Sequence, residues 1–236
     1  KINFFLSLYL SYYLMFNKNH NNIKTIVHHS HHTEETNNFL KDFKNASLLI
    51  TVRDPRANLK SGIFNWIKFD PSKENAEHFL FYIKRIREDL IFAFKTKKKL
   101  FVKLEEANSK KTKRKILKFL KVRYHKNFEL ATFLGRPWSG DKLSNFKNNS
   151  KGKFNKEIQN TNWNLFFSKN DKKILNFIYY DYRVFGYDFN KIHFNSFLYF
   201  IFFSLMPLSF EKKLFSINYL LNSDKYKRYK ILNLYF

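Results

Sequence analysis

Residues 48–66 read LLITVRDPRANLKSGIFNW, and the fold expected for the whole chain follows from this stretch. The run from Ser47 to Val52 is apolar and rich in β-branched residues, a pattern typical of a parallel strand covered on both faces. Asp54 and Pro55 come directly after it, and this pair is a good start signal for a helix that continues to the end of the stretch. The stretch therefore predicts a strand that leads at once into a helix, with Arg53 at the junction.

The same alternation of strand and helix extends to both sides of this stretch. The pattern predicts strands at Ile23–His28 and Leu100–Leu104, and helices at Thr33–Phe43, at Ile116–Leu120 and from Ser168 to Gly186. A further long helix is predicted behind Asp70-Pro71, and one of its faces carries the apolar residues Phe79, Ile83, Ile86, Leu90 and Phe94. Residues 133–164 hold three of the five glycines and are expected to form a long functional loop. Strands that alternate with helices predict an α/β fold, a parallel sheet flanked by helices on both faces.

Composition excludes several classes of protein. Apolar residues make up 44% of the 236-residue chain and aromatic residues 20%, which is too hydrophobic for a disordered protein. The chain has no cysteine, so disulfides, thiolate zinc sites and a cysteine nucleophile are excluded. The formal net charge of +25 favours anionic partners. Because Lys, Asn, Ile, Phe and Tyr are all enriched together, an AT-rich coding sequence accounts for much of that charge equally well.

The chain divides into a domain at 1–190 and a hydrophobic, basic extension at 191–236 that is expected to be helical. Within the extension, His193–Phe210 carries no full charge but is interrupted by a proline, so it is borderline for a membrane span. We expect residues 194–236 to pack on the domain or to contact a membrane surface. The apolar run Ile2–Phe16 is short for a span and is expected to be a buried helix. These features predict a cytoplasmic or membrane-associated protein.

Arg53 and Ser61 are the first candidates for ligand binding. Ligands of open α/β sheets bind beyond the carboxyl ends of the strands, which is where Arg53 is expected. Ser61 lies about two helical turns beyond Asp54 and therefore on the same face of the helix. A guanidinium that makes two charge-assisted hydrogen bonds, together with a hydroxyl, can hold one phosphate. The alternative is that Asp-Pro only starts the helix and Arg53 is an ordinary surface residue.

These residues resemble the 3′-phosphate-binding motif of sulfotransferases, in which an Arg-x-Pro helix start is followed by a serine eight residues after the arginine. Further segments follow in the order of that family: Lys103-Leu104-Glu105-Glu106 with a basic helix behind it, Phe133–Gly140, Ser150–Lys153, Trp163 and the closing Phe185-Gly186-Tyr187. The resemblance covers roughly residues 23–188.

The resemblance implies a P-loop-NTPase-like parallel sheet and an enzyme that takes the sulfuryl group of 3′-phosphoadenylyl sulfate, its donor substrate. The acceptor would be a hydroxyl of a carbohydrate, a lipid or a small alcohol. Arg53 and Ser61 would bind the 3′-phosphate, and Lys151 with Gly152 would close over the nucleotide. The expected partners are thus an anionic nucleotide and a hydroxyl acceptor, and no metal is needed.

A general base is also implied by the resemblance. The family carries a catalytic histidine at the end of the strand that precedes the arginine-bearing strand, and His31 is the match because Ser30-His31 fits the family's Thr-His. A neutral imidazole suits removal of a hydroxyl proton at neutral pH. His29 and His32 are the reserve candidates. Two alternatives remain, since four histidines among residues 28–32 could bind a metal or form an inert strand end.

The sequence departs from the family in two places. The segment before His28 has no glycine, so the Gly/Ser/Thr-rich loop that cradles the donor's 5′-phosphosulfate has no counterpart, and we expect the chain to begin after that loop. The family's lysine two places before the catalytic histidine is His29 here. A truncated, catalytically inactive relative is therefore an alternative to an active enzyme.

A basic nucleic-acid-binding protein is the remaining alternative. In such a protein the basic residues should line one face. In the sequence they are spread along every expected helix, so no nucleic-acid partner is expected.

Overall fold

The computed structural model describes residues 27–30, 33–69, 77–130, 132–133, 136–137, 162–189 and 208–214, together with Leu8, Ser11, Met15, Leu198 and Ile201. The elements, with η for 3₁₀ helices, are α2 Thr33–Asp42, β1 Leu48–Val52, α3 Pro55–Phe69, α4 Glu77–Lys95, β2 Lys99–Lys103, η1 Leu104–Glu106, α5 Lys110–Leu120, η2 Lys126–Glu129, β3 Thr132–Phe133, β4 Arg136–Pro137, α6 Trp163–Phe166, α7 Lys169–Ile178, η4 Tyr180–Phe185 and α9 Ser209–Leu214.

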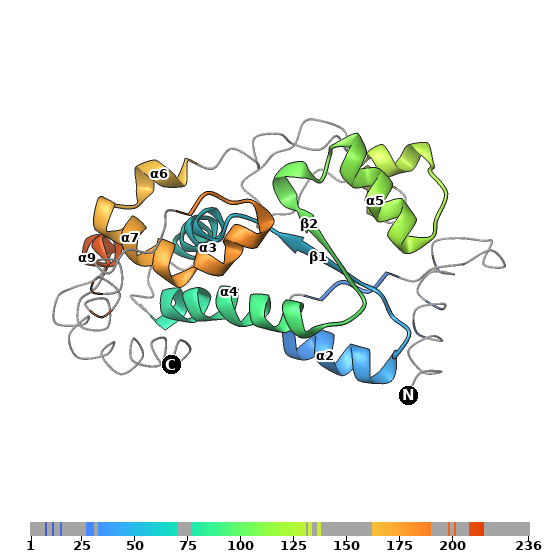
Figure 1. The fold of residues 1–236 in the computed structure, drawn as a ribbon, viewed down its shortest axis with the longest axis horizontal. Coiled ribbons are helices and arrows are strands. Elements are labelled where there is room, and N and C mark those ends of the chain that lie inside the picture. The colour runs from blue at the N-terminus through green and yellow to red at the C-terminus, as the bar shows by residue number, and fades with distance from the viewer. Residues whose placement is uncertain are drawn as a thin grey trace.

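The strand and helix predicted from residues 48–66 are both present, as β1 and α3. β1 pairs in parallel with β2, with Leu48 opposite Lys99 and Val52 opposite Lys103. Figure 1 shows the two strands side by side, with α2 and α4 below them and α5 above. The described part of the chain is therefore a mixed helix and sheet structure with a small parallel sheet, which is compatible with the predicted α/β class.

Helices α3, α4, α7 and η4 enclose the main hydrophobic core. Its most deeply buried members recur at helical spacing, at Leu59 and Ile63, at Ile83, Ile86 and Leu90, and at Ile174, Leu175 and Ile178. α3 and α4 approach closely at Gly62, where an added Cβ would lie 2.9 Å from the Tyr82 ring. The Tyr182 hydroxyl donates a hydrogen bond of 3.0 Å to the Ile86 carbonyl, so η4 is fixed on α4.

The described part of the predicted C-terminal extension contributes to this same core. Leu208 and Phe210 are buried among the core residues, and α9 begins there. Ser168 and Asp171 form the capping box that starts α7, and the second Asp171 oxygen accepts the Ser209 N–H at 2.9 Å. One carboxylate therefore caps α7 and holds α9 against it.

Two expectations about the sheet are not met in the residues that the structure describes. The described end of the predicted strand Ile23–His28 has no regular structure; Val27 is 78% exposed, and His28 stacks on Phe39 of α2 with ring centroids 4.6 Å apart. Only these two residues of the predicted strand are described, and within the described ranges no strand pairs with them. The β-propensity of a residue depends strongly on such a context.

β1 was expected to be covered on both faces, but Leu49 and Thr51 are exposed. The face that carries Ile50 and its register partner Phe101 is covered, because Phe101 packs on Phe94 of α4 and Phe185 of η4. Helices thus cover one face of β1 well and leave the other partly open.

Within the described ranges, no helix combines the length and the apolar composition that crossing a membrane requires. Most of the apolar runs Ile2–Phe16 and His193–Phe210 lies outside these ranges. The predicted loop at 133–164 is described only at its ends, where β3 and β4 pair antiparallel and α6 begins.

Candidate functional site

The carboxyl ends of β1 and β2 bring together polar side chains from three distant segments. Arg53 and Asp54 follow β1, Glu105 follows β2 within η1, and Tyr187 follows η4. Glu105 joins them, since one carboxylate oxygen accepts the Asp54 backbone N–H at 3.2 Å and the other accepts the Tyr187 hydroxyl at 2.8 Å. The Tyr187 hydroxyl also lies 3.3 Å from the Val52 carbonyl oxygen. All three segments belong to the motifs named in the sequence.

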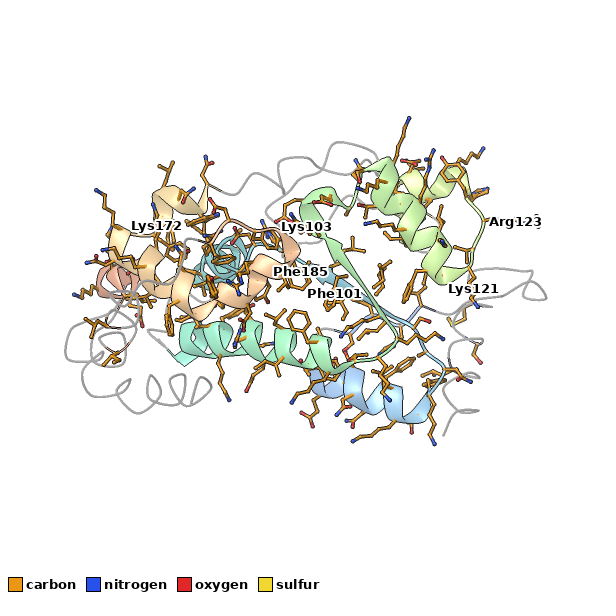
Figure 2. The ribbon with its side chains drawn as sticks, viewed as in Figure 1. Phe101, Lys103, Lys121, Arg123, Lys172 and Phe185 are labelled. Atoms are coloured by element: carbon orange, nitrogen blue, oxygen red, sulfur yellow. The ribbon has the colours of Figure 1, made fainter. Side chains whose placement is uncertain are left out.

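Aromatic packing fixes the segment that carries Tyr187. Phe185 contacts Phe101 of β2, with centroids 4.9 Å apart, and stacks on Phe94 of α4. Lys103, at the end of β2, places its Nζ 4.6 Å from the centroid of the Tyr187 ring and 3.3 Å from the Glu106 carboxylate. Figure 2 shows Phe101, Lys103 and Phe185 together beside β2. Gly186 ends η4 with a φ of 75°, a left-handed conformation that glycine adopts without steric cost.

Arg53 is the candidate anion ligand of this cluster. Its side chain is half-buried, and this burial lowers the pKa of the guanidinium, whereas the charges of Glu105 and Asp54 act in the opposite direction. An arginine side chain starts from so high a pKa that it stays protonated. Arg53 therefore supplies a permanent positive charge at the end of β1.

Asp54 is held by Arg56, a residue that the sequence analysis missed. Asp54 caps α3 by accepting the Arg56 N–H at 2.9 Å, and its two oxygens bind the Arg56 guanidinium at 2.9 and 2.7 Å. Arg56 is only 4% exposed, lies between the Trp163 and Phe189 rings at 4.0 and 4.2 Å, and donates to Asn176. No local signal could identify this arrangement, because the aromatic partners lie more than 100 residues away in the sequence.

The other predicted site residues are placed unevenly. Ser61 is partly buried in the second turn of α3, along the helix that Asp54 caps. His31, Lys151 and Gly152 lie outside the described residues, as does His32. The reserve base His29 is exposed. The structure thus brings Arg53 to the expected strand end and Ser61 to the following helix, and the remaining assignments stay predictions.

The alternative of a histidine metal site gains no support from the part of the chain that the structure describes. Among those residues, no three His, Asp or Glu side chains lie close enough to hold a metal ion. Because His31 and His32 fall outside them, this alternative is not tested at the cluster itself.

The Tyr187–Glu105 contact predicts a specific pH dependence of stability. Burial raises the pKa of Tyr187 above its ordinary value of 10.0, and the hydrogen bond to Glu105 raises it further. Above about pH 10 the unfolded chain therefore loses the Tyr187 proton while the folded chain keeps it. The free energy of unfolding then falls as the pH rises, by up to about 1.4 kcal/mol per pH unit for each such tyrosine. Urea unfolding at pH 9, 10 and 11 should show a shallower fall in Tyr187→Phe, by about 1 kcal/mol per unit.

The variant Tyr182→Phe is the matched control for this measurement. Burial raises the pKa of Tyr182 as well, so its removal should flatten the profile by a similar amount without affecting Glu105. An unchanged slope in Tyr187→Phe would show that the Tyr187 hydroxyl is not held as described.

Comparison of the chain with protein-family models, with curated proteins and with solved structures finds no match. The resemblance to sulfotransferases therefore stays a prediction from the motifs in the sequence.

Proposed function

We propose that this chain is a sulfotransferase-like domain that binds 3′-phosphoadenylyl sulfate and transfers its sulfuryl group to an acceptor hydroxyl. The observation that carries the proposal is the convergence of three motif segments, at Arg53-Asp54, Glu105 and Tyr187, on the carboxyl ends of two parallel strands. This is the edge at which open α/β sheets bind their ligands. On this proposal the small sheet is part of a P-loop-NTPase-like sheet.

The charge arrangement around Arg53 suits a phosphate. Two carboxylates lie nearby and would repel an anion, but each has its own donors. The Asp54 carboxylate is neutralised by the Arg56 guanidinium, and Glu105 accepts two hydrogen bonds. A phosphate at the end of β1 would therefore meet the Arg53 charge with the Asp54 charge already compensated by Arg56. Glu105 keeps its negative charge, because both of its donors are neutral, and that charge acts on the Arg53 guanidinium.

The proposed reaction is an in-line displacement at sulfur. The acceptor oxygen forms a bond to sulfur, the bond from sulfur to the bridging phosphate oxygen breaks, and adenosine 3′,5′-bisphosphate leaves. His31 takes the proton of the acceptor hydroxyl, Arg53 and Ser61 hold the 3′-phosphate, and Lys151 with Gly152 closes over the nucleotide. Positioning and electrostatic stabilisation can supply most of the catalysis in such a transfer.

The product nucleotide provides the test. Adenosine 3′,5′-bisphosphate at about 100 times its Kd should stabilise the folded chain by about 2.7 kcal/mol, because it binds the folded state alone. For a chain of this size that corresponds to a rise in Tm of about 5–10 °C. Differential scanning fluorimetry should show this rise with the bisphosphate and a much smaller one with adenosine 5′-monophosphate, which lacks the 3′-phosphate. Equal effects of the two nucleotides, or none from either, would contradict the proposal.

A further inference from the structure

Helix α5 gathers its basic residues on one exposed face. Five cations are exposed along its length: Lys110, Lys111, Arg114, Lys115 and Lys118. At 3.6 residues per turn they fall within an arc of about 140°, and the row from Lys110 to Lys118 is about 12 Å long. Lys121 and Arg123 extend the row, and Figure 2 shows both on the turn after α5, at the outer edge of the molecule.

The opposite face of α5 packs against the rest of the protein. Thr112 and Ile116 are buried, and Lys113, also buried, pairs with Glu129. The sequence from 107 to 128 has no acidic residue, so the exposed face carries positive charge alone. A surface helix that inserts into a bilayer needs an apolar face that can enter the lipid. α5 has already buried that face, which leaves a purely electrostatic surface long enough to follow a charged backbone.

An exposed aromatic residue stands at the end of the basic row. Tyr124 is 60% exposed and lies between Arg123 and Lys126, and all the residues at 123–126 are exposed. A basic track next to an exposed ring is the arrangement by which proteins bind single-stranded nucleic acid, with cations on the phosphates and bases stacked on the ring. In a duplex the bases already stack on each other, so the exposed ring favours a single strand.

We propose that α5 and the turn that follows it form a binding surface for single-stranded nucleic acid. The exposed cations of α5 contact successive phosphates, and Tyr124 stacks on a base. The sequence argued against nucleic acid because its basic residues are spread over every helix, but on α5 the fold collects them on one side. This surface does not include Arg53 or Ser61, so the binding of nucleic acid can be tested independently of the proposed transferase activity.

The salt dependence of binding tests the phosphate contacts. A fluorescein-labelled oligothymidylate, on the order of 20 nucleotides long so that it spans the row, is titrated with the full chain at increasing NaCl concentration. Each phosphate contact adds about −0.7 to the slope of log K against log salt for a single strand. The triple variant Arg114→Ala/Lys115→Ala/Lys118→Ala should bind more weakly, with a slope smaller in magnitude by about 2.

The matched control removes the same charge from another exposed surface. Lys169→Ala/Lys212→Ala/Lys213→Ala takes three exposed cations from α7 and α9 and should leave the slope within about 0.5 of the parent value. Equal losses in the two triple variants would overturn the α5 assignment, because they would show a response to net charge alone.

The Tyr124 variants distinguish nucleic acid from other polyanions. Tyr124→Ala should weaken oligothymidylate binding by about 5-fold to 150-fold through loss of stacking, whereas Tyr124→Phe should bind like the parent. Heparin, a DNA duplex and phosphatidylserine vesicles should bind more weakly than the oligothymidylate and should not respond to Tyr124→Ala. If Tyr124→Ala leaves oligothymidylate binding unchanged, or if heparin or the vesicles bind more tightly, the proposed partner is wrong.

Discussion

Asp54→Ala is expected to lower the free energy of unfolding by about 3–5 kcal/mol, the typical result of removing one partner of a buried ion pair. Arg56 is 4% exposed and would keep its charge between Trp163 and Phe189 without the carboxylate that binds it twice. The variant also removes the cap of α3, because Asp54 accepts the Arg56 N–H. The corresponding fall in Tm is about 6–20 °C.

Two further variants identify the cause of this loss. Glu88→Ala removes a carboxylate from an exposed pair, with Lys84 at 3.1 Å, and should cost no more than about 1 kcal/mol. Asp54→Ala/Arg56→Met removes both charges and should recover much of the stability lost in Asp54→Ala, because no unpaired charge is then buried. A double variant as unstable as Asp54→Ala would mean that the cap, and not the ion pair, accounts for the effect.

The parts of the fold that the sequence predicts correctly are those set by short-range signals. Asp54-Pro55 starts α3 by a cap and a preset backbone angle, and both act within one turn of the helix. Ser168 and Asp171 start α7 by bonding to each other's backbone. The apolar spacing of α4 likewise places Ile83 in the core. Such features depend on neighbours within four residues, so the sequence is sufficient to find them.

The features that the sequence analysis missed depend on partners far away in the chain. Arg56 looks like any helix-surface arginine until Trp163 and Phe189 close over it. Val27 belongs to a β-branched run, yet it has no strand to pair with in the described part of the chain. The sequence offers Tyr187 only within a motif that resembles one of a known family, and its contact with Glu105, 82 residues away, could not be predicted.

Arg53→Ala is expected to remove most of the stabilisation of the chain by adenosine 3′,5′-bisphosphate. A guanidinium that binds a phosphate in a bidentate way makes two charge-assisted hydrogen bonds, each worth about 1.5 kcal/mol or more. Their loss should therefore raise the Kd for the nucleotide at least about 100-fold. At a nucleotide concentration of 100 times the parent Kd, the remaining stabilisation would then be about 0.4 kcal/mol, or a Tm rise of about 1 °C. Comparing each variant with and without nucleotide removes any effect of the substitution on the stability of the free protein.

Arg53→Lys and Arg183→Ala complete this experiment. Lysine keeps the charge but not the planar fork of donors, so Arg53→Lys should give an intermediate rise in Tm. Arg183, exposed on η4, stacks on Tyr180 at 4.1 Å and lies outside the cluster at the strand ends, so its removal should leave the nucleotide effect unchanged. A full rise in Arg53→Ala would place the 3′-phosphate elsewhere. Equal losses in Arg53→Ala and Arg183→Ala would show that the nucleotide responds only to overall positive charge, and either result would remove the main support for a sulfotransferase site at the end of β1.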